Sequence, residues 1–169
     1  MLRLLKILLL STLVLSGCRF NNKDKTTDQS KTDGLLPKME LFDLDNKVVR
    51  LDEYKGKTIF INFWATWCKP CIEEMPSIEK AQAIMSDKEV VFLLASSEPI
   101  EEIKEFNKTH KYKFKYVHLE NGETLNIQAL PTTFIINPKG NLVFSEMGSR
   151  NWDESENINL IKNITKQHD

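Results

Sequence analysis

Short apolar runs alternate with amphipathic stretches over most of the chain. KTIFINFW at 57–64 and VVFLLAS at 90–96 are nearly continuous apolar runs with β-branched members, which predicts strands buried on both faces. After each of them, apolar residues recur at steps of three and four, which is typical of amphipathic helices. Such stretches predict helices over 70–85, over 99–110, and around Ile158, Ile161 and Ile164.

Weaker patterns predict the remaining strands. MELFDLDNKVVRL, at 39–51, predicts a hairpin, and FKYVHL, at 114–119, predicts a short strand. TTFIINP and NLVFSEM flank a Pro-Lys-Gly turn and predict a second hairpin. Because strands that alternate with helices form parallel sheets, the predicted fold is an α/β sandwich whose late hairpin adds an antiparallel edge.

The first 34 residues have a different pattern, and we predict that they lie outside the folded domain. Residues 1–17 carry two basic residues before the largely apolar run ILLLSTLVL, as a secretory signal does, and this run is shorter than the roughly 20 residues of a membrane-spanning helix. The run ends in LSGC, which resembles the lipobox of bacterial lipoproteins and implies cleavage after residue 17 and a lipid on Cys18. An ordinary signal peptide and an uncleaved signal-anchor remain alternatives. Polar residues 18–34 predict a flexible tether, which leaves 35–169 as the domain.

Composition narrows the class of function. The chain has 169 residues, 41% of them hydrophobic, so it is long enough to bury one core. Its net charge of −1 gives no basic excess of the kind that nucleic-acid binding needs, and we expect a monomer without nucleic-acid partners. Three cysteines are too few for a disulfide scaffold. If Cys18 carries lipid outside the cytosol, where disulfides persist, Cys68 and Cys71 are the remaining thiols.

Cys68 and Cys71 lie in the motif WCKPC, directly between the first buried strand and the first predicted helix. Unpaired N–H groups and the positive end of the dipole at a helix start stabilise a thiolate, and Lys69 adds a nearby positive charge. Both effects lower the pKa of Cys68, and only the thiolate attacks a disulfide. Pro70 fits the first helical turn, and Cys71 follows one turn after Cys68. The residues therefore predict a redox pair, with Cys68 attacking and Cys71 resolving.

Two other roles for the cysteine pair are open. A structural zinc site needs four ligands, and the chain has neither a second cysteine pair nor ligand spacing among His110, His118 and His168. A purely structural bridge over two residues closes a very small loop and so adds little stability. Redox exchange is favoured over both, and we expect no metal and no organic cofactor.

The motif FINFWATWCKPC, followed about 60 residues later by LPTTFIINPKG, resembles the thioredoxin superfamily. Over residues 35–165 the chain is similar to the TlpA/ResA-type membrane-anchored thiol–disulfide oxidoreductases of bacteria, in a lipoprotein form. The resemblance implies a thioredoxin-like sandwich, with a central mixed sheet flanked by helices and an extra N-terminal hairpin. It also implies a cis bond before Pro131, beside the cysteines, where the backbone pairs with an incoming peptide.

The same resemblance implies a reductase on the periplasmic side of a bacterial membrane, held there by lipid. Its expected partners are protein disulfides or thiols, such as apocytochrome c, and a thiol-type electron donor in the membrane. Direction depends on the reduction potential, which spans about −270 to −120 mV in this fold. A disulfide-donating oxidase and a noncatalytic binding lipoprotein therefore remain alternatives.

Asn62 and Glu74 mark a departure from cytosolic thioredoxins. Those proteins carry a buried acid at the position of Asn62, which cannot titrate. Some TlpA/ResA-type members instead use a glutamate three residues after the second cysteine, here Glu74, which shares a helix face with Cys71. We hypothesise that Glu74 accepts the proton of Cys71; a solvated carboxylate on an exposed face is the alternative. Trp67 is expected to pack beside the disulfide and shape its surface.

Overall fold

The computed structural model describes residues 38–85 and 89–166. The predicted signal peptide, Cys18 and the tether all lie outside the described residues. Within the described ranges, no helix has the length and apolar character needed to cross a bilayer.

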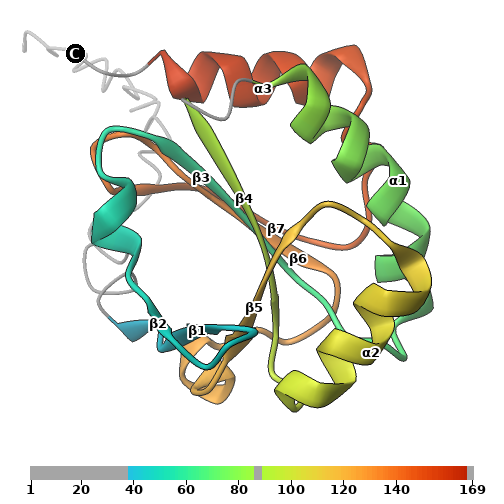
Figure 1. Cartoon of the computed structure of the whole chain (residues 1–169). Helices are drawn as coiled ribbons and strands as arrows, with labels where there is room; N and C mark the ends of the chain where they lie inside the picture. The colour runs from blue at the N-terminus through green and yellow to red at the C-terminus, as the bar shows by residue number, and fades with distance from the viewer. Residues whose placement is uncertain (1–37, 86–88, 167–169) are drawn as a thin grey trace, which may run out of the picture.

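A seven-stranded mixed sheet forms the centre of the described chain, in the order β2-β1-β5-β4-β3-β6-β7 (Figure 1). Its strands are β1 (Leu41–Asp43), β2 (Val48–Val49), β3 (Thr58–Phe63), β4 (Val90–Ser96), β5 (Lys115–Leu119), β6 (Thr132–Ile136) and β7 (Leu142–Met147). Strands β3, β4 and β5 are parallel, as the alternation of strands and helices predicts. Antiparallel pairing adds β6 and β7 on one side and the β1–β2 hairpin on the other. The predicted α/β sandwich with an extra N-terminal hairpin is confirmed.

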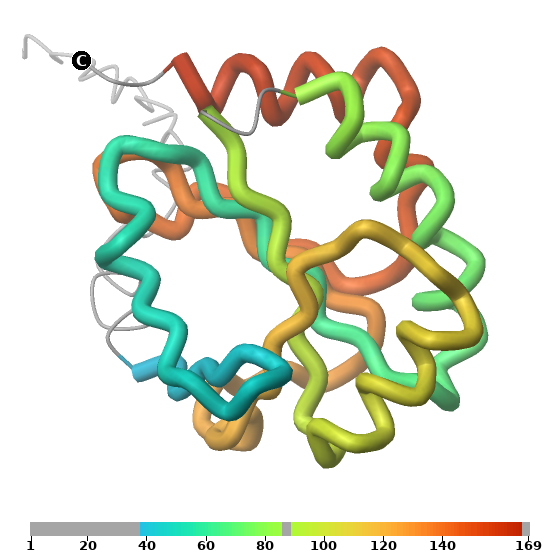
Figure 2. The backbone as a smooth tube through the Cα atoms, in the orientation of Figure 1, coloured from blue at the N-terminus to red at the C-terminus, as the bar shows by residue number. Residues whose placement is uncertain are grey.

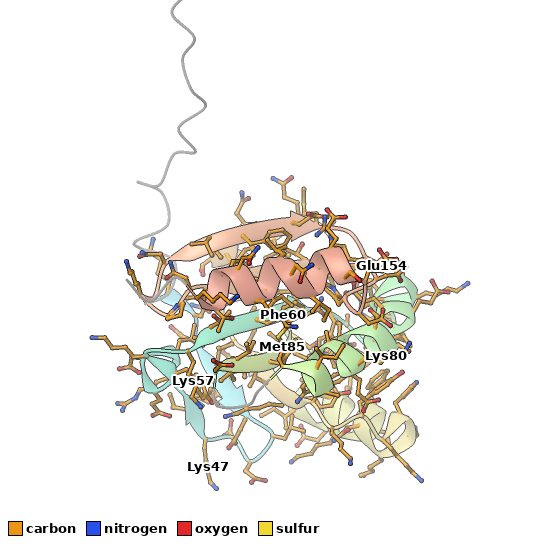
Figure 3. The ribbon with its side chains drawn as sticks, turned by 90° about the horizontal axis from the view of Figure 1, so that it is seen from above. Lys47, Lys57, Phe60, Lys80, Met85 and Glu154 are labelled. Carbon is orange, nitrogen blue, oxygen red and sulfur yellow. A yellow bond between two sulfur atoms is a disulfide. The ribbon has the colours of Figure 1, made fainter. Side chains whose placement is uncertain are left out.

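Three helices, α1 (Lys69–Ile84), α2 (Ile100–His110) and α3 (Ser155–Thr165), lie along one side of the sheet (Figure 1). The crossovers through α1 and α2 step in the same direction across the parallel strands, so their common handedness places both helices on one face. Their apolar residues share one core with the sheet, and Figure 3 shows Phe60 of β3 next to α3. The opposite face is covered by the N-terminal hairpin and two short 3₁₀ turns that the sequence did not predict, η3 (Leu51–Tyr54) and η4 (Gly122–Leu125).

The cysteine motif and Pro131 meet at one edge of the sheet. Phe63, at the end of β3, pairs with Thr132, at the start of β6. The loop that leads to Cys68 and the segment that contains Pro131 therefore leave the sheet at the same edge. The Leu130–Pro131 peptide bond is cis, as the resemblance implies. The carboxyl ends of β3 and β4 lie at this edge, which is where α/β folds place their reactive groups.

Candidate active site

Cys68 and Cys71 form a disulfide at the start of α1, with an S–S distance of 2.01 Å. Cys68 is the N-cap residue, and its carbonyl oxygen accepts the first helical hydrogen bond, from the N–H of Ile72 at 3.1 Å. Cys68 is 4% exposed and Cys71 is completely buried. The arrangement presents the sulfur of Cys68 at the helix start, where unpaired N–H groups favour a thiolate.

The two residues between the cysteines affect the site unequally. The Nζ atom of Lys69 lies 3.6 Å from Oε1 of Glu73, and both side chains are largely exposed. Solvent and the partner carboxylate weaken the field of such a charge, so the helix start stabilises a Cys68 thiolate more than Lys69 does. Pro70 occupies the first turn of α1, where its missing N–H removes no helical hydrogen bond.

Trp67 forms one wall of a groove of about 430 Å³ beside the cysteine loop. Its side chain is 74% exposed, so the ring makes few contacts with the rest of the described chain and is available to an incoming polypeptide. Leu130, the residue before Pro131, lines the same groove. Trp67 therefore contributes to the surface near the site mostly from the solvent side.

Glu98 holds the loop that carries the cysteines, a contact that the sequence analysis missed. Its carboxylate accepts hydrogen bonds from the backbone N–H of Thr66 at 2.7 Å and from the Thr66 hydroxyl at 2.6 Å. A third hydrogen bond comes from the hydroxyl of Ser96 at 3.0 Å. Thr66 lies two residues before Cys68, so Glu98 fixes the backbone that leads into the redox pair. The position of Glu98 just after a strand that ends at the reactive edge was the signal available in the sequence.

Replacing Glu98 by alanine is expected to lower the free energy of unfolding by about 1–3 kcal/mol, because the N–H of Thr66 loses its partner in a half-buried site. Urea unfolding of the oxidised protein measures this effect. Glu102→Ala, on the exposed first turn of α2, is the matched control and should change little. Equal stability losses in the two variants would contradict the assigned role of Glu98.

Glu74 is 3% exposed, which excludes the alternative of a solvated carboxylate. Its Oε1 atom accepts a hydrogen bond from Nδ2 of Asn62 at 2.7 Å, and its Oε2 atom accepts one from the backbone N–H of Arg150 at 3.0 Å. Burial raises the pKa of Glu74, and these two hydrogen bonds lower the pKa by less. The indole N–H of Trp152 meets no acceptor at hydrogen-bond geometry but lies near enough to lower the pKa slightly as well. Glu74 is therefore a buried acid one helical turn after Cys71.

Asn62 connects Glu74 to the strand that follows Pro131. It is completely buried near the carboxyl end of β3, and its Nδ2 atom also donates to the hydroxyl of Thr133 in β6 at 3.0 Å. Its Oδ1 atom has no hydrogen-bond partner in the described part of the chain. Asn62 thus supplies a donor to Glu74 where cytosolic thioredoxins supply an acid.

The histidines in the described chain do not extend the cysteine site. His118 lies against Glu98 and Glu120, with Nδ1 2.9 Å from the Glu98 carbonyl oxygen and Nε2 2.8 Å from a Glu120 carboxylate oxygen. Among residues 38–85 and 89–166, no three His, Cys, Asp or Glu side chains gather as metal ligands do. His168 and Cys18 lie outside these ranges.

Comparison with known proteins identifies this arrangement. The family model described as Redoxin matches residues 30–161. The chain belongs to the Redoxin family. The thiol-disulfide oxidoreductase ResA of Bacillus thuringiensis subsp. konkukian is 33% identical to it over 133 residues, which are 76% of this chain and 76% of ResA. The thioredoxin-like protein YneN of Bacillus subtilis is 34% identical over 125 residues, which are 71% of this chain and 74% of YneN.

A solved structure supports the same assignment. The exposed lipoprotein thioredoxin Etrx1 of Streptococcus pneumoniae superposes with a TM-score of 0.57 at 28% identity, over 73% of this chain and 97% of Etrx1. Together with the Cys68–Cys71 pair, these relatives show that this Redoxin-family chain is a TlpA/ResA-type thiol–disulfide oxidoreductase of the thioredoxin superfamily.

Proposed function

We propose that the protein reduces disulfides of extracytoplasmic proteins through Cys68 and Cys71. The observation that carries the proposal is the cysteine pair at the start of α1, at the sheet edge it shares with Pro131. A peptide lying along the Trp67 groove would pair with the backbone beside Pro131 and bring its disulfide to Cys68. No organic cofactor or metal takes part in the proposed reaction.

The proposed reaction begins with the reduced enzyme. The Cys68 thiolate attacks one sulfur of the substrate disulfide, so that a mixed disulfide forms and the other substrate sulfur leaves as a thiolate. Cys71 then gives its proton to the Glu74 carboxylate and attacks the Cys68 sulfur. This step releases the second substrate thiolate and forms the Cys68–Cys71 disulfide. Two electrons have passed to the substrate, and its thiolates take up protons.

Glu74 suits the role of proton acceptor because of its burial. A general base works best when its pKa lies near the operating pH, and burial raises the pKa of Glu74 from its ordinary value in that direction. A thiol-type donor in the membrane would then reduce the Cys68–Cys71 disulfide and complete the cycle.

The proposed location is the outer side of a bacterial membrane. Residues 1–17 would act as the signal peptide, Cys18 would carry the lipid, and residues 18–34 would tether the domain that follows. The similarity to the exposed lipoprotein thioredoxin of Streptococcus pneumoniae supports this anchor. Apocytochrome c, or another secreted protein with a reducible disulfide, is the proposed substrate.

The reduction potential of the Cys68–Cys71 pair tests the direction. We expect a value near the thioredoxin end of the range, at about −270 mV, because the proposed reaction needs a dithiol that gives up electrons to a substrate disulfide. The protein is equilibrated with dithiothreitol or glutathione, and the fluorescence of Trp64 and Trp67 reports the redox state. A value near −120 mV, at the oxidising end of roughly the same scale, would assign the protein as a disulfide donor.

A further inference from the structure

The segment between β7 and α3, residues 148–152, closes over Glu74. It begins at Gly148, whose N–H donates to the carbonyl oxygen of Pro131 at 2.8 Å. Two residues later, the N–H of Arg150 donates to Oε2 of Glu74 at 3.0 Å. Figure 2 shows this segment, between orange and red, running beside α1. One short segment therefore touches both Pro131 and the buried carboxylate.

A second contact fixes the same segment to α1. The hydroxyl of Ser77 donates to the carbonyl oxygen of Glu74 at 2.7 Å and accepts a hydrogen bond from the N–H of Trp152 at 3.0 Å. Ser77 is buried, and the indole of Trp152 is completely buried against Phe60. The segment is thus tied to α1 at Arg150 and again at Trp152.

The side chain of Arg150 joins the two elements that the segment connects. Its Nε atom donates to Oε1 of Glu146 in β7 at 2.7 Å, and its Nη1 atom donates to Oδ1 of Asn157 in α3 at 2.7 Å. The guanidinium lies 5.6 Å from the ring centre of Phe144 and 5.8 Å from that of Trp152. Charge-assisted hydrogen bonds in a partly shielded site, with aromatic faces beside them, hold more firmly than an exposed ion pair.

We propose that Arg150 is a positioning residue of the redox site. Its guanidinium fixes residues 148–152, so that its own backbone N–H stays on Glu74 and water is kept from that carboxyl group. Arg150 does not touch the reacting atoms; it acts through Glu74. The inference rests on the proposed role of Glu74 as proton acceptor for Cys71.

The groups that face Glu74 in the described chain are uncharged. They are the Asn62 amide from β3, and the backbone N–H of Arg150 and the indole of Trp152 from the segment. On the same face of its own helix, one turn earlier, lies the titratable Cys71, whereas Lys69, Glu73 and Lys80 of α1 are exposed and form ion pairs elsewhere. The charge of Arg150 is directed to Glu146 and Asn157 instead. The proton affinity of Glu74 therefore depends mainly on how well the segment excludes water.

Arg150→Met tests the proposal, because methionine keeps an unbranched apolar stem but cannot make the two hydrogen bonds of the guanidinium. When the segment loosens, water reaches Glu74. The loss of burial outweighs the loss of one N–H bond, so the titration midpoint of Glu74 moves to lower pH. The ¹³C signal of the Glu74 carboxyl group in the oxidised protein measures this midpoint directly. Resolution of a mixed disulfide by Cys71 should slow by about tenfold, less than the roughly 10²-fold that a misplaced catalytic group can cost.

Lys80→Met is the matched control. Lys80, labelled in Figure 3, also links α1 to the chain after β7, through an ion pair with Asp153 at 2.9 Å, but it makes no contact with Glu74. Its loss should leave the Glu74 midpoint in place. Glu146→Gln weakens the hydrogen bond that residue 146 accepts from Nε of Arg150 but does not remove it. This variant should move the titration midpoint of Glu74 in the same direction as Arg150→Met but by less. This milder variant decides the matter if Arg150→Met does not fold.

An unchanged Glu74 midpoint in folded Arg150→Met, or in Glu146→Gln if that variant alone folds, would overturn the proposal and leave Arg150 a purely structural role. This outcome is distinct from a failure of the proposed function. If Glu74→Gln left the titration and reactivity of Cys71 unchanged, Glu74 would not be the proton acceptor. In that case the carboxyl titration of Glu74 in Arg150→Met and in the wild-type protein would still report whether Arg150 controls the environment of Glu74.

Discussion

Cys68→Ser is expected to abolish disulfide exchange, by about 10³-fold or more, because the attacking thiolate is lost. Cys71→Ser is expected to stop turnover at a different point. Its Cys68 can still attack a substrate disulfide, but nothing resolves the product, so a mixed disulfide between Cys68 and the substrate should accumulate. Turnover with a fluorescent peptide disulfide, followed by mass spectrometry of the protein, distinguishes the two blocks.

The position of each cysteine gives the physical reason for this asymmetry. Cys68 caps α1 and is slightly exposed, whereas Cys71 is completely buried in its first turn. A substrate sulfur can therefore reach Cys68 more easily than Cys71. A stable adduct on Cys71 in the Cys68→Ser variant, with none on Cys68 in the Cys71→Ser variant, would reverse the assignment. To exclude that either variant fails to fold, both are compared with the reduced wild-type protein, which also lacks the Cys68–Cys71 disulfide.

Glu74→Gln is expected to slow the resolution step by about 10²-fold at neutral pH, the lower end of what a general base contributes. The initial attack by Cys68 should change much less, because Glu74 lies one turn beyond Cys71. Single-turnover kinetics of mixed-disulfide formation and decay separate the two steps. Equal rates of decay in the variant and the wild-type protein would show that Cys71 loses its proton elsewhere.

The same variant should change stability in a pH-dependent way. Burial raises the folded-state pKa of Glu74 above its unfolded value, so the folded protein binds more protons than the unfolded chain between the two. The wild-type protein therefore loses stability as pH rises through this window, and glutamine, which does not titrate, removes that loss. The variant's stability relative to wild type should increase from acid to neutral pH.

The buried site can supply a hydrogen-bond partner for the glutamine of Glu74→Gln. The Oδ1 atom of Asn62 has no partner in the described chain, so rotation of the Asn62 amide would offer an acceptor to the new glutamine N–H. Urea unfolding of the oxidised proteins in acid and at neutral pH measures the difference. Glu73→Gln, which changes an exposed carboxylate one residue earlier, should show no comparable trend. A relative stability of Glu74→Gln that stays constant with pH would contradict the burial argument.

Local signals were enough to predict the elements that carry the cysteines. The apolar run of β3 and the three- and four-residue periodicity of α1 both arise within one element, and WCKPC lies between them. The parallel centre of the sheet followed from the alternation of strands and helices. The short turns η3 and η4 were not predicted, because four residues give too little periodicity to separate a helical turn from a loop.

The sequence by itself determined the redox pair, its place at a helix start and the α/β sandwich, because each depends on neighbouring residues or on the order of elements. The thioredoxin-like architecture was implied by the resemblance of its two motifs to that superfamily. The sequence left Glu74 open between a buried base and a solvated carboxylate, since the helix face shared with Cys71 does not reveal what covers it. Only the tertiary structure decided this, because the covering segment at Arg150 comes 76 residues later in the chain. The hydrogen bond from the Thr66 N–H to Glu98, 32 residues later in the chain, could not be predicted for the same reason. Burial and hydrogen bonding of a polar side chain are properties of the packed fold, and no local pattern records them.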